Sequence, residues 1–420
     1  MELSAWGTKM AALSGIRSIM EDIAVTSTGA DSGEWLNLSP GNPAAIPEAA
    51  ATWQRLEQEA VADGFAAASG RYGPSRGTDG LVQAIVRYFN QRYGWGISAQ
   101  NVLVGPGSQL LCFIATTIFT GPHPGGNRKL VLPATPDYTG YQGLNLEPGG
   151  IAGLPSRIVR EDNRHFHYAL EPGPLRQGEP PGMMLLSSPS NPACRSITAG
   201  ELAELVSIAE AYDIPLVVDN AYGEPFPTIT ASSARPVHHP NVINCFTLSK
   251  AGLAGERIGF AIGGTQPISA MLSFLANCAL HAPQLIQAVV ARALDSGELD
   301  TLTASIIRPY YVNKRRSAEK LLEELLPSSI RWRLHSSDGG MFCWLWIDEP
   351  WFDDLTMYEE MKRRKVFIVP GRHFFVPSPE APPDEHSTRC IRLSLSADES
   401  VIAEGTARLA RALEQMSHAQ

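Results

Sequence analysis

The middle of the chain alternates short apolar runs with stretches of helical periodicity. Strands are predicted at 129–132, 183–186, 216–219, 245–248 and 258–262, where most side chains are apolar. Such runs are typical of strands that are buried on both faces, and helices between them supply the crossovers of a parallel sheet. The pattern therefore predicts an α/β fold with a mostly parallel sheet covered by helices.

Helices are predicted where apolar residues recur every three or four positions. One spans 50–68, another begins after Thr78, and a third begins at Thr198, where Glu201 completes a capping box. Residues 1–45 contain a turn-rich Ser-Pro-Gly-Asn-Pro segment and are predicted to be irregular.

The pattern changes after about residue 306. A long helix at 310–326 is followed by an alternating strand at 341–346, by strands at 366–369 and 391–394, and by a final helix. This mixture indicates a smaller α+β domain. We therefore expect an N-terminal arm with part of the small domain, a large domain, and a C-terminal small domain: residues 1–48, 49–308 and 309–420.

Composition and charge narrow the class of protein. The 420 residues carry a formal net charge of −9, which argues against a nucleic-acid surface. No signal peptide is evident, and the longest apolar stretch, 110–119, is about half a membrane span. The six cysteines are scattered without C-x-x-C pairing, so no metal site is expected. We expect a cytoplasmic protein that binds neither membranes nor nucleic acid.

Two strand ends carry residues with a specific chemistry. One apolar run ends in Asp219, and the next strand is followed by Ser249 and Lys250. Ligands of parallel sheets bind beyond the carboxyl ends of the strands. Pyridoxal 5'-phosphate needs a lysine that forms a Schiff base with its aldehyde and an acid that holds a proton on its ring nitrogen. Either fragment alone is weak, because Ser-Lys dipeptides are common.

A phosphate site is predicted beside this pair. Gly107-Ser108-Gln109 follows a strand and opens a helix, where free N–H groups and the helix dipole favour a phosphate. Thr247, Ser249 and Arg257 add two hydroxyls and a guanidinium. A glycine turn before a helix is common, and Arg257 alone could form a surface salt bridge. The prediction therefore depends on these residues acting together.

Further polar and aromatic residues lie at compatible positions. Tyr138 follows a strand and could stack on a pyridine ring, although alone it is more often a packing residue. Asn191 and Tyr222 could bind the phenolic oxygen, although Asn-Pro usually marks only a turn. Arg392 lies in a strand of the second domain, where it could bind a substrate carboxylate or form an exposed salt bridge.

These residues, in this order, resemble the fold-type I pyridoxal-phosphate aminotransferases of class I and II. The resemblance extends from Ser39 to Ser394 and implies a large domain with a mostly parallel seven-stranded sheet plus a smaller α+β domain. The chain is most similar to the valine–pyruvate aminotransferase branch, through these segments: Ser14-Gly15-Ile16, Met20-Glu21-Asp22, Gly41-Asn42-Pro43-Ala44, Asp219-Asn220-Ala221-Tyr222-Gly223, Trp344-Leu345-Trp346 and Val369-Pro370-Gly371.

The resemblance implies a role for each residue. Catalysis would use Lys250 as the Schiff-base lysine and proton carrier, Asp219 at the ring nitrogen, and Tyr222 at the phenolic oxygen. The cofactor would also be held by Gly107, Ser108, Gln109, Tyr138, Asn191, Thr247, Ser249 and Arg257. The substrate, an amino acid or 2-oxo acid, would contact Arg392, Gly41, Asn191 and Arg17. Tyr72 would reach the phosphate of the other subunit, which implies a homodimer with shared active sites.

The chain departs from the family pattern near the substrate. Ala193-Cys194 stands where the family usually has Thr-Gly, which we expect to alter a turn, and Arg17 and Arg76 are extra cations expected near the mouth of the site.

The first hypothesis for the function is amino transfer between an aliphatic amino acid and a 2-oxo acid such as pyruvate. The alternative is a pyridoxal-phosphate enzyme of natural-product biosynthesis that performs elimination, replacement or carbon–carbon bond formation, for example on S-adenosylmethionine. A regulator with an aminotransferase-like domain is disfavoured, because no helix-turn-helix pattern precedes Gly41 and the charge is acidic.

Overall fold

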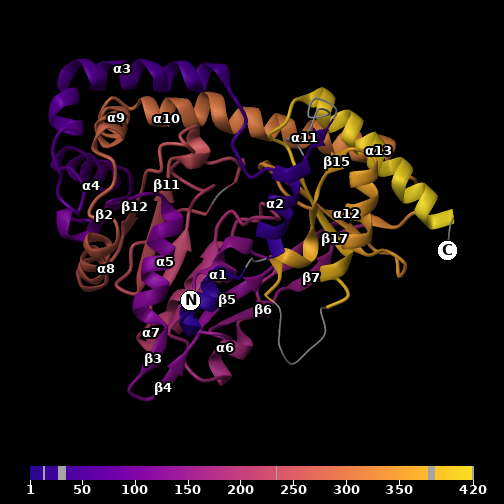
Figure 1. The fold of residues 1–420 in the computed structure, drawn as a ribbon, viewed down its shortest axis with the longest axis horizontal. Coiled ribbons are helices and arrows are strands. Elements are labelled where there is room, and N and C mark those ends of the chain that lie inside the picture. The colour runs from indigo at the N-terminus through magenta and orange to yellow at the C-terminus, as the bar shows by residue number, and fades with distance from the viewer. Residues whose placement is uncertain (13–14, 27–34, 233, 377–383, 419–420) are drawn as a thin grey trace.

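The structure is a computed structural model that describes residues 1–12, 15–26, 35–232, 234–376 and 384–418 (Figure 1). The helices are α1 (Ala5–Ala11), α2 (Gly15–Thr26), α3 (Pro47–Ser69), α4 (Asp79–Tyr93), α5 (Ser108–Phe119), α6 (Gly173–Gln177), α7 (Ala199–Tyr212), α8 (Thr265–Cys278), α9 (Gln284–Asp295), α10 (Glu298–Leu302), α11 (Arg308–Leu325), α12 (Asp354–Arg363) and α13 (Glu399–His418). The strands are β1 (Leu36–Asn37), β2 (Val102–Gly105), β3 (Gly121–His123), β4 (Gly126–Arg128), β5 (Leu130–Thr135), β6 (Ile151–Pro155), β7 (Arg157–Arg160), β8 (His165–Ala169), β9 (Met183–Ser187), β10 (Leu216–Asp219), β11 (Val242–Thr247), β12 (Gly259–Ile262), β13 (Trp332–His335), β14 (Phe342–Ile347), β15 (Val366–Phe367), β16 (Val369–Pro370) and β17 (Cys390–Ser394).

A seven-stranded sheet forms the centre of the larger part of the molecule. Its strand order is β2-β12-β11-β10-β9-β5-β6. β12 is antiparallel to both of its neighbours, and β11, β10, β9, β5 and β6 pair in parallel. The predicted α/β fold with a mostly parallel seven-stranded sheet is therefore confirmed.

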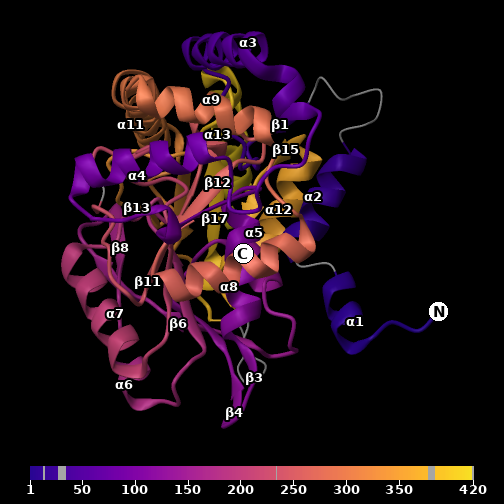
Figure 2. The ribbon, with the colours of Figure 1, turned by 90° about the vertical axis from the view of Figure 1, so that its left-hand side faces the viewer.

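Helices cover both faces of this sheet because successive side chains of a strand point to opposite faces. In β10, Val217 packs with α5 and α8, whereas Leu216 and Val218 pack with α7 on the other face. Phe246 of β11 and Phe260 of β12 pack with α4 and α9. In Figure 2, α8 and α7 lie on different sides of the strands. With both faces covered, a ligand is expected at the strand ends.

A second, six-stranded sheet lies beside the first, among the orange and yellow elements of Figure 1. Its order is β16-β17-β14-β13-β8-β7, so the β7–β8 hairpin from the middle of the chain pairs with strands near the C-terminus. β1 adds to β15 in parallel, which ties the N-terminal region to the same unit. The three-part division of the chain stays a prediction, but residues 157–169 share a sheet with strands of the proposed small domain.

The predicted elements match the structure best where apolar runs are long. The strand predicted at 129–132 continues through Pro133 to Thr135, and the prediction missed the strands between 151 and 169. The prediction of an irregular N-terminal region was wrong, because α1 and α2 form there. Docking stabilises these short helices: Lys9 donates to the carbonyl of Glu147 at 2.6 Å, and Tyr358 donates to Asp22 at 2.7 Å.

Within the described residues, no helix is both long and apolar enough to cross a membrane. The same part of the chain holds no group of three or more histidine, cysteine, aspartate or glutamate side chains suited to a metal ion. All six cysteines are free, and all except Cys278 are buried.

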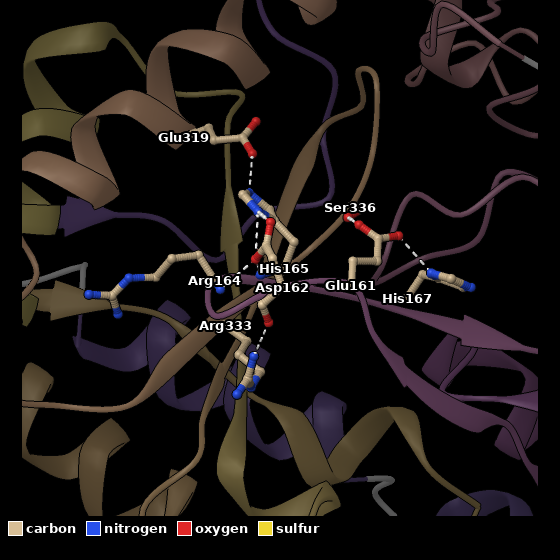
Figure 3. Close-up of polar contacts among 8 residues, drawn as sticks. All are labelled: Glu161, Asp162, Arg164, His165, His167, Glu319, Arg333 and Ser336. Atoms are coloured by element: carbon tan, nitrogen blue, oxygen red, sulfur yellow. Dashed lines mark hydrogen bonds and ion pairs between the residues drawn. The ribbon is translucent and has the colours of Figure 1, made fainter.

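A histidine joins the β7–β8 hairpin to α11. Figure 3 shows the ring of His165 between two carboxylates, with Nδ1 3.0 Å from Asp162 and Nε2 2.9 Å from Glu319 of α11. Burial lowers the pKa of His165, but the hydrogen bonds to Asp162 and Glu319 outweigh it, so the pKa is raised overall. Protonated His165 therefore stabilises the contact between the hairpin and the helix.

Replacing His165 with glutamine is expected to destabilise the protein at pH 5.5 and much less at pH 9. A raised pKa in the folded state contributes stability that is complete below the unfolded value of 6.5 and is lost as pH rises through the folded value. The expected loss is on the order of 0.5 kcal/mol. Thermal unfolding at the two pH values measures it. The matched control is His167→Gln: His167 lies on the same strand as His165, and its ring lies 2.6 Å from Glu161. Equal losses of stability at the two pH values for His165→Gln would contradict the assignment.

Candidate active site

Lys250 lies in a single 3₁₀ turn (Ser249–Ala251) directly after β11. Its amine donates to the carbonyl of Gly41 at 2.6 Å and lies 5.6 Å from the centroid of the Tyr222 ring. Burial and the neighbouring Arg392 lower the pKa of Lys250 to about 8, against the opposing charge of Asp219. About a tenth of this amine is therefore uncharged at pH 7, and a nucleophile requires the uncharged form.

Asp219 ends β10 and is buried beside the lysine's strand. Its carboxylate accepts hydrogen bonds from the Tyr141 hydroxyl at 3.0 Å, the Ala221 N–H at 3.1 Å and the Ser108 hydroxyl at 3.5 Å. Burial raises the pKa of Asp219 to about 6, although the bonds from Tyr141 and Ser108 oppose the rise. A buried carboxylate of this kind favours a cationic partner.

Hydroxyls and a guanidinium converge where α5 begins. Thr247 and Ser249 contact each other at 2.9 Å, and Arg257 donates to Ser249 at 3.2 Å. Gly107, with φ +84°, precedes the helix, and a Cβ built on it would lie 2.4 Å from Nη2 of Arg257. Only glycine fits at this position. The free N–H groups of the helix and Arg257 together form a site for a phosphate-sized anion.

Tyr138, Asn191 and Tyr222 lie around the same strand ends. The ring of Tyr138 packs edge-on against Tyr141 with 5.2 Å between centroids, and Asn191 lies 3.5 Å from the Tyr222 hydroxyl. Burial raises the pKa values of both Tyr138 and Tyr222, so the two phenols stay neutral donors. Gln109 donates to the carbonyl of Gly140 at 3.3 Å, so its side chain also adjoins the turn after Tyr138.

Arg392 projects from β17 and is buried between two aromatic rings. Its guanidinium carbon lies 4.2 Å from the Phe342 centroid and 5.1 Å from that of Phe374, and Nη1 donates to Asn191 at 2.9 Å. Nη2 donates to the carbonyl of Ser39 at 2.5 Å. Nε has no hydrogen-bond partner among the residues that the structure describes. Burial lowers the pKa of Arg392 to about 10, so a buried cation with an unused donor is available for a carboxylate.

The sequence pattern of the family "Aminotransferase class I and II" matches residues 34–409. The chain belongs to this family. Class I and II aminotransferases are pyridoxal-phosphate enzymes, so this chain is a pyridoxal-phosphate-dependent transferase that acts on amino acids and 2-oxo acids. It is similar to the valine–pyruvate aminotransferase of Escherichia coli K12, with 31% identity over 417 residues covering 99% of each chain.

Solved aminotransferase structures are also similar over the whole chain. Valine–pyruvate aminotransferase from Salmonella typhimurium LT2 has a TM-score of 0.86 and 30% identity, covering 97% of this chain and 100% of that one. A provisionally named amino-acid aminotransferase from Psychrobacter arcticum 273-4 has a TM-score of 0.93 and 28% identity, covering 100% of both chains. The predicted aminotransferase family is confirmed.

Two residues predicted for this aminotransferase site, Tyr72 and Arg17, are exposed. Tyr72 is 86% exposed, and its ring contacts His281 with 6.1 Å between centroids. Arg17 is exposed on α2, and Ser14 of the same predicted segment lies outside the described residues. The expected position of Arg76 near the mouth was wrong: it donates to the carbonyls of Ala99 at 3.1 Å and Val102 at 2.8 Å, at the opposite end of β2 from the site.

The loop after Asn191 contains a cysteine in a backbone conformation that favours glycine. Cys194 has φ +55°, and its N–H donates to the carbonyl of Ser190 at 2.8 Å. The thiol leaves no room for a Cβ on Gly340, which would lie 2.5 Å from Sγ. In this aminotransferase loop, Cys194 therefore adopts the left-handed backbone conformation, and its side chain packs against Gly340.

The sequence reasoning missed several side chains that complete this aminotransferase site. Tyr141 follows Tyr138 by three residues, and this spacing in a 3₁₀ turn (Thr139–Gly143) could have indicated that both rings face one side. Phe342 begins an alternating strand, but no local signal shows that it faces Arg392. Asp137 is an acid just after the end of β5, so the pattern that identified Asp219 could have identified it too.

Proposed function

We propose that this enzyme moves an amino group between an aliphatic L-amino acid, similar to valine or alanine, and a 2-oxo acid such as pyruvate. The similarity to valine–pyruvate aminotransferase over 99% of both chains supports this substrate class. The supporting geometry is a buried Arg392 with an unused donor, able to bind the carboxylate that all these substrates share.

The residues present fit pyridoxal 5'-phosphate. The cradle of Gly107, Ser249 and Arg257 admits a phosphate, which Ser108 and Thr247 would also hold, and the buried carboxylate of Asp219 suits a protonated ring nitrogen. Tyr138 would stack on the ring, and Gln109 would hold the loop beside it. When bound, the cofactor supplies an aldehyde that condenses with amines and a ring that withdraws electrons from the substrate Cα.

The chain's own residues would bind the substrate and move one proton. Arg392 would bind the α-carboxylate. The hydrogen bond from its Nη1 to Oδ1 of Asn191, 2.9 Å long, would hold the guanidinium in place. Lys250, whose pKa is lowered to about 8, would take the proton from Cα as a free amine and return it at the cofactor carbon. Gly41, whose carbonyl accepts from Lys250, would release the amine as substrate enters. Tyr222 would donate to the phenolic oxygen.

The comparisons do not favour elimination, replacement or carbon–carbon bond formation as the reaction. The similarity to aminotransferases extends over the full chain rather than over the cofactor residues alone. Arg17, exposed on α2, stays a proposed substrate contact. We also propose a cytoplasmic location, where the six free cysteines, five of them buried, would stay reduced.

The proposed active form is a homodimer with shared sites. Tyr72 is 86% exposed, and Leu280, beside its contact residue His281, is 54% exposed. Phe65 and Val61, on the last turns of α3 before Tyr72, are 54% and 42% exposed. Such a group of exposed apolar side chains is typical of an interface. Tyr72 would thereby donate to the phosphate held by the partner subunit.

Mixing two inactive variants is expected to restore activity if the sites are shared. Lys250→Ala and Tyr72→Ala damage different residues of one composite site, so a mixed dimer contains one site in which both residues are intact. After co-refolding in equal amounts, about a quarter of the normal turnover is expected, because half of the dimers are mixed and each has one intact site. No gain over the separate variants would contradict a shared site.

Substrate assays test the proposed reaction directly. The enzyme loaded with cofactor is mixed with valine or alanine alone, and the 2-oxo acid is quantified against enzyme concentration. One equivalent of 2-oxo acid, with loss of the visible absorbance of the bound cofactor and its return on adding pyruvate, is expected. Release of a substituent from the amino-acid side chain, with no 2-oxo acid from valine or alanine, would overturn the proposal.

A further inference from the structure

A second buried acid adjoins the site, and the proposed chemistry does not use it. Asp137 follows β5 and is only 2% exposed. Its Oδ1 accepts from the N–H of Tyr138 at 2.6 Å and from the hydroxyl of Ser187, and its Oδ2 accepts from the N–H of Ser187 at 3.0 Å. One carboxylate therefore holds the end of β5 to the end of β9.

These contacts continue to the residues that would face cofactor and substrate. The Ser187 hydroxyl accepts from the N–H of Asn191 at 3.3 Å, and Asn191 in turn contacts Tyr222 and Arg392. Asp137 thus connects Tyr138, on the ring-stacking side, to Asn191, on the side of the phenolic oxygen. Loss of the carboxylate would leave buried N–H groups without acceptors, which costs free energy and allows both segments to shift.

The backbone of Asp137 also contacts the second sheet's side of the site. Its N–H donates to the carbonyl of Phe374 at 3.0 Å, and the ring of Phe374 lies against Arg392. The position of Asp137 is therefore tied to the aromatic residue that flanks the predicted carboxylate site. A change at Asp137 would reach Arg392 by two routes, through Phe374 and through Asn191.

The carboxylate borders a small polar cavity. The cavity has a volume of about 20 Å³ and is lined in part by Asp137, Ser187, Ser190, Arg195 and Tyr168. This is room for about one water molecule with several polar partners. Burial raises the pKa of Asp137 to about 7, against the hydrogen bonds from Ser187 and Tyr138, and the charge of Asp219 adds to the rise.

We infer that Asp137 is a positioning residue of the amino-transfer site. Its carboxylate fixes Tyr138, which would stack on the cofactor ring, relative to Asn191, which would bind the phenolic oxygen of that ring. This inference rests on the proposed function for its kinetic consequence. Its structural basis does not depend on that function: Asp137 accepts from Tyr138 and Ser187, Ser187 accepts from Asn191, and the N–H of Asp137 donates to Phe374. Asp137 contacts none of the groups proposed to react, so it acts through these neighbours.

Asp137→Asn is the direct test. The amide has nearly the same size as the carboxylate. Its NH₂ group, however, is a donor and would face at least one of the three donors that now bond to the carboxylate, which are the N–H of Tyr138 and the N–H and hydroxyl of Ser187. We expect about a tenfold higher dissociation constant for pyridoxal phosphate and about a tenfold higher KM for the amino acid, with a smaller fall in kcat. We also expect the pH midpoint of the cofactor's visible absorbance to move upward by about half a unit, because Asn191 and Tyr222 hold the phenolic oxygen less well.

Two further variants make the test decisive. Ser187→Ala keeps the acid but removes its link to Asn191, and it should change the pH midpoint in the same direction by a smaller amount. Asp338→Asn is the matched control, because Asp338 also accepts from the N–H (2.7 Å) and hydroxyl of one serine, Ser232, but is exposed. It should leave the dissociation constant, KM and kcat within about twofold of the wild type and the pH midpoint unchanged.

The outcomes separate this inference from the proposed function. If folded Asp137→Asn has the dissociation constant and the pH midpoint of the wild type, the inference is wrong whatever the reaction is. If Asp137→Asn does not fold, wild-type values for Ser187→Ala overturn it. If the wild type binds the cofactor but forms no 2-oxo acid, the proposed function fails, while the binding and spectral comparison between variants still decides the role of Asp137.

Discussion

Replacing Lys250 with alanine is expected to lower turnover by at least about 10⁴-fold. In the proposed mechanism one amine both holds the cofactor and moves the proton, and removing a group with two roles is not compensated elsewhere. The structure places that amine at the end of β11, with a pKa lowered to about 8 by burial and by Arg392. Alanine also removes the covalent link that borohydride reduction would trap. Steady-state kinetics and the mass of the reduced protein measure the two effects.

Lys314→Ala is the matched control for this change. Lys314 is also buried and also donates to a backbone carbonyl, that of Ala397, at 2.5 Å. Its loss is expected to affect thermal stability and to leave turnover and the covalent link intact. If Lys250→Ala kept more than about a tenth of the normal turnover, the lysine would not be the proton carrier, since a general base contributes about 10² to 10⁴-fold on its own.

Replacing Asp219 with asparagine is expected to lower kcat by about 10² to 10⁴-fold. In the proposed mechanism the neutral amide would no longer hold a proton on the ring nitrogen. Breaking a buried charge pair costs about 3–5 kcal/mol, which corresponds to that range of rates. Stability without cofactor should respond differently. Because burial raises the pKa of Asp219 to about 6, its charge opposes folding above that pH, and any stabilising effect of the acid is complete only below its unfolded pKa of 3.8.

The cofactor-free asparagine variant should therefore unfold at the same temperature as the wild type, or higher, at pH 8. Asp300→Asn is the control, because Asp300 also accepts a tyrosine hydroxyl, that of Tyr88, at 2.5 Å, but lies on α10. A fall in kcat that parallels a fall in thermal stability in both variants would show that Asp219 is structural. Separation of the two effects in Asp219→Asn alone is the expected result.

The sequence predicted those parts of the site that are local to strand ends. Asp219, Lys250 and the glycine turn at Gly107 each lie at or just after the end of an apolar run, so period and residue type located them, and the resemblance to the family implied their roles. The strand β10 was predicted with its observed bounds because it is wholly apolar and ends in an acid. The capping box at Thr198 was likewise predicted from two residues and is present.

Features that depend on distant packing could not be predicted in this way. Phe342 and Phe374 flank Arg392 only because β14 pairs with β17 and the turn after β16 folds back on it. The strands β7 and β8 are short, partly polar and partly exposed, so their pairing with β13 leaves little periodic signal. The helices α1 and α2 depend on docking contacts more than on intrinsic preference.

The pairing of β1 with β15 has a consequence for how a ribosome must build this enzyme. Leu36 of β1 pairs with Val366 of β15, and the hairpin at 157–169 pairs with β13, so both N-terminal partners are synthesised long before the strands they pair with. At ordinary rates of synthesis, the first strand emerges roughly 15 to 65 s before its partner. Nascent chains therefore carry unpaired strand edges for most of translation. A message truncated before β15 yields a product that lacks the partner of β1 and also lacks β16 and β17 of the six-stranded sheet. Such fragments are natural targets for chaperones and proteases.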